Sequence, residues 1–318
     1  MRIQIYSVIM PVVMGLQLSV CAQLSAQTVV YAEADSVVWR QETTNKEETG
    51  LEAGPQSTAL ETEDLEDSPE ILNFVDAFGE SYQVEINPRI EKHDYEFGAF
   101  WRDGMKLSYE GDVRYTYRLG VDVSYHQGVI DWDKVKADGY DFAFLRIGYR
   151  GYGQSGTINL DKQFIKNIKN AQQAGLEVGV YFFSQAVNEQ EAAEEADFVL
   201  AQLKGYELQL PVVYDPESIL HAKARTDNVT GEQFTKNTIV FCEKMKEAGY
   251  EPMIYSNMRW EAYQFDLEAL SEYPIWYADY EPLPQTPYHF RFWQYTNEGS
   301  VSGIKGAVDL NIELIPIE

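Results

Sequence analysis

Two carboxylates, Asp215 and Glu217, stand one residue apart at the end of the apolar segment Pro211–Tyr214. If this segment is a β-strand, side chains two residues apart point to the same face, and both carboxylates enter one site. Two like charges in one site cannot both ionise cheaply, so one carboxyl keeps its proton and becomes an acid beside a charged partner. The segment alone also fits a surface loop with two solvated acids, so the rest of the chain must decide.

From residue 119 onward, strand-like and helical segments alternate. Short apolar runs predict strands at Gly120–Ser124, Phe142–Ile147, Glu177–Phe183, Pro211–Tyr214, Pro252–Tyr255, Pro274–Ala278, Phe290–Tyr295 and Ala307–Leu310. Between them, Asp131, Asn188 and Thr230 are predicted helix N-caps, and glycines end the helices. Eight strands, five of them followed by helices, predict an α/β, TIM-like barrel with parallel strands over residues 119–318.

Such a barrel brings four carboxylates to one mouth, because the active sites of these barrels lie at the C-terminal strand ends. Asp122 belongs to the first strand, Asp215 and Glu217 to the fourth, and Asp309 to the eighth. The first and eighth strands are neighbours in a closed barrel, and the fourth lies across the mouth from them. Uncompensated acids in one pocket cost stability, so the four are predicted to be catalytic.

The composition narrows the class of protein. The 318-residue chain has a formal net charge of -26 and is 45% hydrophobic. Nucleic acid is an unsuitable partner for so acidic a chain, because phosphates require clusters of Lys and Arg. The 22 Tyr and six Trp fit either core packing or sugar stacking in an open groove. The four His show no ligand spacing, so neither a metal nor another cofactor is expected.

Three segments precede the predicted barrel. Residues 1–26 carry a basic residue and then an apolar run, which predicts a signal peptide or a membrane anchor. Residues 27–70 are polar and acidic and predict a disordered linker. Residues 71–118 are rich in aromatic residues and turn signals and predict a small β-rich region. The protein is therefore expected outside the cell or on its surface. If the signal is cleaved, Cys242 is the only cysteine, and it is predicted to be a buried helical residue.

Several motifs, in order along the chain, carry a family resemblance. They are Gly120–Gly128, Ile130–Trp132, Asp161, Asn170–Ala171, Gly175–Phe183, Pro211–Glu217, Trp276–Ala278 with Tyr280, Phe292–Tyr295 and Gly306–Asn311. Together they resemble glycoside hydrolase family 25, the Chalaropsis-type lysozymes, which cut bacterial peptidoglycan. The resemblance implies a (β/α)5β3 barrel with N-acetylmuramidase activity. It also implies that Glu217 is the catalytic acid, with Asp122, Asp215 and Asp309 around it.

Cleavage between N-acetylmuramic acid and N-acetylglucosamine needs a proton on the leaving oxygen and support for an oxocarbenium-like centre. Glu217 would donate the proton, and Asp215 and Asp309 would favour its protonated form by like-charge repulsion. Asp215 is predicted to orient the substrate's own acetamido group as nucleophile. The alternatives are Asp215 or Asp122 as nucleophile or as base for a water. Pro216 departs from the family pattern, and because proline fixes φ and lacks a donor, we expect the strand to bend there.

Other side chains are candidates for the sugar groove. Tyr181, Tyr255 and Trp276 end strands and are predicted to line the groove together with Gln294, although aromatic residues at these positions also fit the core. Arg146 on the second strand is predicted to pair with one of the acids inside the barrel, and direct contact with substrate is the alternative.

Some alternatives concern function. His126 closely follows Asp122, but a lone histidine is more often structural than catalytic. A chitinase-like N-acetylglucosaminidase could use a similar pair of acids. A non-catalytic wall-binding module would result if Pro216 spoiled the site. The expected partner is cell-wall peptidoglycan, with a membrane tether through the N-terminus as one arrangement, and the expected state is a monomer.

Overall fold

A computed structural model of the chain describes residues 69–219 and 222–317. The predicted targeting segment, residues 1–26, and nearly all of the predicted linker, residues 27–70, lie outside these ranges. Within the described ranges, no helix combines the length and the apolar character needed to cross a bilayer.

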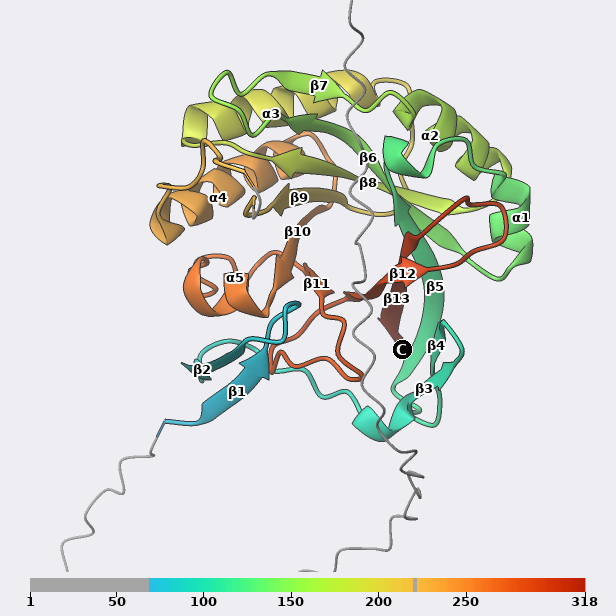
Figure 1. The fold of residues 1–318 in the computed structure, drawn as a ribbon, viewed down its shortest axis with the longest axis horizontal. Coiled ribbons are helices and arrows are strands. Elements are labelled where there is room, and N and C mark those ends of the chain that lie inside the picture. Colours follow the sequence, from blue (N-terminus) through green and yellow to red (C-terminus); the bar gives the residue numbers. More distant parts are fainter. Residues whose placement is uncertain (1–68, 220–221, 318) are drawn as a thin grey trace, which may run out of the picture. The chain divides into compact units, whose positions relative to one another are not determined.

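Eight strands close into a barrel-like sheet, which confirms the predicted barrel (Figure 1). The last strand of the series pairs with the first, and the first also pairs with the second. A further short strand, β7 (Ile158–Leu160), extends β6 at the rim. In order around the barrel the strands are β5 (Tyr115–Val123), β6 (Phe142–Arg150), β8 (Glu177–Ser184), β9 (Val212–Pro216), β10 (Pro252–Asn257), β11 (Ile275–Ala278), β12 (Phe292–Gly299) and β13 (Val308–Pro316).

A helix follows each of the first five barrel strands along the chain. They are α1 (Trp132–Ala137), α2 (Phe164–Gln173), α3 (Glu189–Leu203), α4 (Gly231–Glu247) and α5 (Met258–Tyr263). The predicted caps are confirmed: Asp131, Asn188 and Thr230 each accept a hydrogen bond from the backbone N–H three residues on. These bonds satisfy donors that the first helical turn leaves unpaired. Cys242 is buried in α4, as predicted.

The last strand runs against the rest of the barrel. β13 is antiparallel to both β12 and β5, so the prediction of a fully parallel barrel is wrong. The connection between β12 and β13, residues 300–307, is too short for the crossover that a parallel neighbour requires. The predicted strand Ala307–Leu310 continues to Pro316, and the first barrel strand begins at Tyr115, earlier than the predicted Gly120.

Aromatic rings fill the interior of the barrel. Phe142 and Phe144 on β6 and Trp276 on β11 are almost fully buried there. Two glycines make room for these rings. A Cβ atom at Gly120 would lie 2.2 Å from the Phe142 ring, and one at Gly179 would lie 2.5 Å from the Phe144 ring. A larger residue at either position would displace the rings, so the packed interior closes the barrel below its mouth.

Residues 71–118 form two hairpins and then enter β5. The hairpins are β1 (Ile71–Val75) with β2 (Ser81–Glu85), and β3 (Phe100–Asp103) with β4 (Lys106–Tyr109). The β1–β2 hairpin lies beside α5, where the Tyr263 hydroxyl donates to the Gln83 carbonyl at 3.0 Å (Figure 1). Phe74 and Tyr95 are buried in the same core as the outer face of the barrel. This N-terminal region therefore packs as part of the barrel's own core.

Candidate active site

Four acidic side chains meet at one mouth of the barrel. β5 carries Asp122, β9 carries Asp215, and Glu217 directly follows β9. Asp309 lies near the start of β13, where it is the register partner of Asp122. Asp309 therefore reaches the mouth from the beginning of an antiparallel strand, not from a C-terminal strand end as predicted. The reversed direction of β13 explains this correction.

Asp122 is the charged centre of the group. Its Oδ2 atom accepts hydrogen bonds from Gln294 Nε2 at 2.8 Å and from Asn311 Nδ2 at 2.9 Å. Burial raises the pKa of Asp122 to about 6, and these amides oppose the rise. Burial and the neighbouring Asp122 charge raise the pKa of Asp309 to about 9, and the two carboxyls are hydrogen-bonded. At neutral pH the proton of this pair therefore resides on Asp309, and Asp122 carries the negative charge.

Glu217 and Asp215 face this charge. Burial, and then the negative charge of Asp122, raise the pKa of Glu217 to about 7, against the opposing effect of Arg146. Burial, followed by the charges of Glu217 and Asp122, raises the pKa of Asp215 well above its usual value. The Oδ1 atom of Asp215 is buried, and no donor among the described residues reaches it. The pair thus offers two carboxyl groups that hold a proton more strongly than exposed acids do, and an Asp215 oxygen able to accept a further hydrogen bond.

Pro216 lies between these two acids within β9. The pairing with β8 continues through this proline, which is opposite Ser184. The pairing with β10 ends at Tyr214, so the missing N–H of the proline interrupts no bond of that ladder. β9 therefore runs on through Pro216 and keeps Asp215 in register with Phe183 of β8.

Gln294 connects Asp122 to two tyrosines at the rim. Its Oε1 atom accepts from the hydroxyls of Tyr255 and Tyr280, each at 2.9 Å, while its amide donates to Asp122. Gln294 is 4% exposed, so its contacts are with the protein, and it orients these side chains. Tyr280, which belongs to a motif but had no predicted role, is 38% exposed and stands at the groove.

Trp276 lies deeper than predicted. It is 1% exposed, and its Nε1 atom donates to Asn311 at 2.8 Å. Tyr181 and Tyr255 stand edge-on to its ring, with centroids at 5.9 Å and 5.0 Å. The expectation that Trp276 lines the groove is therefore corrected: the barrel interior encloses it, and it supports the tyrosines above.

Arg146 pairs with an acid outside the predicted four. Its Nε and Nη2 atoms lie 3.0 Å and 2.9 Å from Asp161 Oδ2, an oxygen that also accepts from the Tyr125 backbone N–H. Asp161 precedes α2, on the side of β6 from which Arg146 projects. The His126 ring packs against Tyr125 with 4.1 Å between centroids, and no hydrogen bond in the described part of the chain joins it to Asp122. The structure thus holds no histidine–aspartate dyad at this point.

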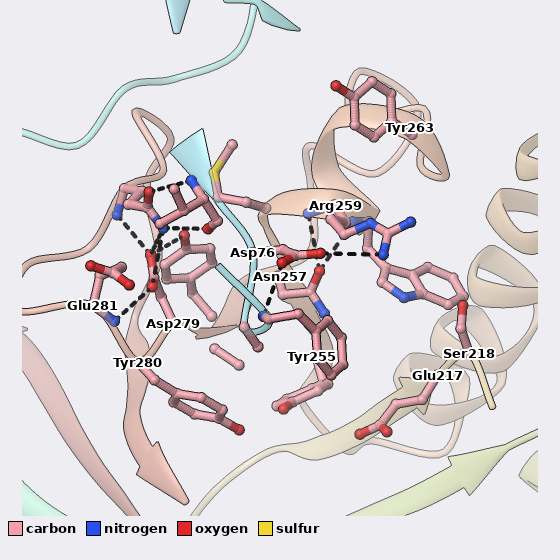
Figure 2. Close-up of a pocket in the computed structure, with 18 of the residues that line it drawn as sticks. Asp76, Glu217, Ser218, Tyr255, Asn257, Arg259, Tyr263, Asp279, Tyr280 and Glu281 are labelled. Carbon is pink, nitrogen blue, oxygen red and sulfur yellow. Dashed lines mark hydrogen bonds and ion pairs between the residues drawn. The ribbon is translucent and has the colours of Figure 1, made fainter. Parts of the chain in front are cut away.

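The mouth opens into a cavity of about 490 Å³ (Figure 2). Glu217, Tyr255 and Tyr280 line it on the barrel side, and the turn between β1 and β2 lines it from the N-terminal region. Across residues 69–219 and 222–317, no three His, Cys, Asp or Glu side chains are placed to share a metal ion. The arrangement can protonate a leaving group at the wall of an open cavity.

The sequence matches the family model described as "Glycosyl hydrolases family 25" over residues 121–304, more than half of the chain. The chain belongs to glycosyl hydrolase family 25. It is therefore a glycoside hydrolase of the lysozyme family, as the ordered motifs predicted. The match includes Asp122, Asp215 and Glu217, and Asp309 lies just beyond its end.

Relatives of this family 25 chain include proteins and solved structures of differing length. It is 30% identical over 232 residues to the uncharacterized protein YegX of Escherichia coli O6:H1 (strain CFT073), covering 70% of this chain and 79% of that protein. It is 25% identical over 194 residues to the autolytic lysozyme of Clostridium acetobutylicum, covering 60% of this chain but only 54% of that enzyme. A solved family 25 glycosyl hydrolase from Bacillus anthracis is 28% identical, with a TM-score of 0.53, and the match covers 64% of this chain and 91% of that one.

The family 25 barrel holds the backbone of Glu217 through a residue that sequence reasoning missed. Gln185, 1% exposed and directly after β8, donates to the Glu217 carbonyl at 2.7 Å and accepts from Thr226 Oγ1 at 2.9 Å. Its position after a barrel strand was the available signal.

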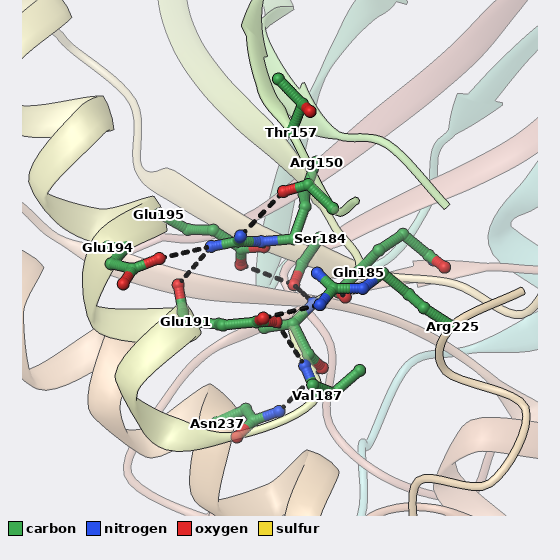
Figure 3. Close-up of polar contacts among 12 residues, drawn as sticks. Arg150, Thr157, Ser184, Gln185, Val187, Glu191, Glu194, Glu195, Arg225 and Asn237 are labelled. Atoms are coloured by element: carbon green, nitrogen blue, oxygen red, sulfur yellow. Dashed lines mark hydrogen bonds and ion pairs between the residues drawn. The ribbon is translucent and has the colours of Figure 1, made fainter. Parts of the chain in front are cut away.

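A buried polar network surrounds Gln185 (Figure 3). Glu195 accepts from Arg150 Nε and from Ser184 Oγ, each at 2.7 Å. Glu191 accepts from Arg225 at 2.6 Å. Satisfied buried networks of this kind are rigid, so the segment that carries Glu217 is held from behind the site.

Proposed function

We propose that this protein cleaves the β-1,4 bond between N-acetylmuramic acid and N-acetylglucosamine in bacterial peptidoglycan. Membership of family 25 and the similarity to the autolytic lysozyme support this substrate. The observation that carries the proposal is the pair at the end of β9, in which Glu217 keeps its proton near neutral pH beside the unpartnered oxygen of Asp215. We also infer that the barrel is of the (β/α)5β3 type.

Glu217 is the general acid in this proposal. It is partly buried at the cavity, where a glycosidic oxygen can reach its carboxyl group. As the bond between the anomeric carbon and this oxygen breaks, the Glu217 proton passes to the oxygen. General acid catalysis of this kind contributes about 10²- to 10⁴-fold in rate.

Asp215 assists through the substrate's own acetamido group. Its free Oδ1 atom accepts the acetamido N–H, which turns the carbonyl oxygen toward the anomeric carbon. A bond forms between these two atoms as the leaving group departs, giving an oxazolinium-like cation. Water then attacks the anomeric carbon, the bond from that carbon to the acetamido oxygen breaks, and the water proton passes to the Glu217 carboxylate. Substrate assistance is a recognised variant of glycoside hydrolysis.

Asp122 and Asp309 complete the electrostatics. Asp122 remains charged and is held by Gln294 and Asn311, so it favours positive charge at the sugar and the protonated form of Glu217. Asp309 carries a proton and therefore adds no second negative charge beside Asp122. Fixed groups of this kind stabilise a developing charge without reorganising during the reaction.

The test is the chemistry of the new reducing ends. Purified cell wall is digested with the protein, reduced with borohydride and analysed by mass spectrometry, beside a digest with Glu217→Gln. Reduced muramic acid ends, absent with Glu217→Gln, are the expected result. Reduced glucosamine ends would identify an N-acetylglucosaminidase. Sedimentation with the wall without any new ends would indicate a binding module.

The parts of the chain before the barrel are assigned in the same proposal. We infer that residues 1–26 direct export or anchor the protein, residues 27–70 act as a linker, residues 71–118 are an accessory region and residues 119–318 form the catalytic barrel. The protein then acts outside the cell or on its surface. N-terminal sequencing of the protein from culture medium and from membranes tests this, and an intact N-terminus found only in the cytosol would contradict it.

A further inference from the structure

The cavity beside Glu217 has a wall that the family match does not include. The turn between β1 and β2, Val75–Gly79, lines the same cavity as Glu217, Tyr255 and Tyr280. The family match begins at residue 121, so this wall lies outside the matched residues.

The hairpin that carries this turn is fixed to the barrel. Gln285 bonds to both backbone groups of Val75, accepting from its N–H at 2.8 Å and donating to its carbonyl at 2.9 Å. Phe74 is buried and stacks on Tyr82 at 5.3 Å, and Tyr263 of α5 packs against both rings. A wall held in this way loses little conformational entropy when a ligand binds.

The turn also presents an aromatic ring in a defined position. Asp76 Oδ1 accepts from the backbone N–H groups of Phe78 at 2.9 Å and Glu80 at 3.1 Å, and Gly79 adopts a φ of 79° that closes the turn. Phe78 stands at the tip of this turn, lines the cavity and is 61% exposed. Because Phe78 lines the cavity on a turn that is held in place, its ring offers an apolar face to a ligand bound there.

The charged side chains that line the cavity favour an uncharged ligand over an acidic one. Four acids line it, Asp76, Glu217, Asp279 and Glu281, and among the described lining residues Arg259 is the only cation. Arg259 already faces Asp76, with Nη1 3.4 Å from Oδ2. An acidic group would be repelled here, whereas the uncharged N-acetylglucosamine units of the strand offer an apolar ring face and hydrogen-bonding groups.

We propose that the β1–β2 turn forms an additional saccharide subsite, in which a pyranose ring of the glycan strand beyond the cleaved pair stacks on Phe78. This rests on the proposed function, because it extends the same trough along the same polymer. Tyr255, Tyr263 and Tyr280 line the same cavity and offer further apolar faces to the strand.

The test compares peptide-free glycan strands of two lengths, the shortest oligosaccharide that is cleaved and an octasaccharide, using the full chain. Phe78→Ala should lower kcat/KM for the octasaccharide about two- to tenfold, mainly through KM, and leave the short substrate within about twofold. Trp101→Ala is the matched control, because Trp101 is 67% exposed on β3 and does not line the cavity. It should change neither value.

A second readout separates this proposal from the proposed function. Octasaccharide binding is measured by calorimetry on Glu217→Gln with and without Phe78→Ala, and the second change should weaken binding by the same factor. If the wild type cleaves nothing but this difference persists, the function fails and the subsite stands. Equal effects on both substrates, no effect on binding, or a loss seen only with peptide-bearing strands would overturn the subsite.

Discussion

Replacing Glu217 by glutamine should remove activity and, at alkaline pH, stabilise the fold. The carboxyl is partly buried next to the charge of Asp122, and burial, followed by this charge, raises its pKa from the ordinary 4.5 to about 7. Glutamine has nearly the same shape but never ionises. The change therefore removes both the transferable proton and, above neutral pH, an unfavourable negative charge.

The sign and size follow from the two pKa values. Between pH 4.5 and about 7 the folded protein binds more protons at Glu217 than the unfolded chain does, so the free energy of unfolding of the wild type falls as the pH rises through this window. Below pH 4.5 the group is neutral in both states and costs nothing. The difference in pKa, at about 1.4 kcal/mol for each pH unit, corresponds to at most about 3.5 kcal/mol at pH 8.

The assay is urea unfolding of wild type and Glu217→Gln at pH 4.5 and pH 8. The variant should be more stable at pH 8 by up to this amount, and the difference should shrink toward zero at pH 4.5. Glu281→Gln is the matched control, because Glu281 lines the same cavity but does not belong to the group of Asp122, Asp215, Glu217 and Asp309. The stability difference between this variant and the wild type should not grow between pH 4.5 and pH 8 in the same way. A variant that is equally or less stable than wild type at pH 8 would refute the argument that burial and like charge hold the proton on Glu217.

Further predictions concern the same site and the chain before it. Wild-type kcat/KM should fall as the pH rises through about 7, approaching tenfold for each further pH unit, because only protonated Glu217 can donate a proton to the leaving oxygen. A kcat/KM that stays unchanged up to pH 9 would contradict this. Asp215→Asn should lower kcat about 10²- to 10³-fold with little change in KM, since an amide stabilises the cationic intermediate less than a carboxylate. Gln185→Leu should lower kcat while changing the urea midpoint little, because it removes the hydrogen bond to the Glu217 carbonyl. Activity and urea unfolding measured on the same preparation check this. Removing residues 1–68 should leave a soluble, active enzyme, whereas removal through residue 118 should give insoluble protein, because Phe74 and Tyr95 belong to the core; solubility and wall-lysis assays decide both.

The sequence predicted most of the barrel because its signals are local. Alternating apolar runs and capping residues such as Asn188 and Thr230 mark strands and helices directly, and strand ends locate Asp122 and Asp215. The direction of β13 depends on the length of one connection, which apolar periodicity does not report. For that reason the sequence placed Asp309 at the mouth but not at the correct end of its strand.

Side-chain partners were harder to predict than positions. Arg146 was expected to pair with one of the four acids inside the barrel, yet its partner is Asp161, from the segment before α2. Trp276 and Tyr255 are register partners on neighbouring strands, but only the packing of the rings inside the barrel decides which is buried and which reaches the cavity. The approach of the β1–β2 turn to Glu217 joins residues more than a hundred positions apart, and no local pattern encodes it.

The most direct test of the central claim, that Glu217 protonates the leaving oxygen while Asp215 orients the substrate's acetamido group, is the configuration of the first product. Proton NMR during the cleavage of a defined muramic acid-containing oligosaccharide, recorded before mutarotation, shows which anomer forms first. The account predicts the β-anomer, with configuration retained and no glycosyl-enzyme mass in the quenched protein. An α-anomer formed first would contradict it, because inversion requires a carboxylate-activated water instead of the acetamido oxygen.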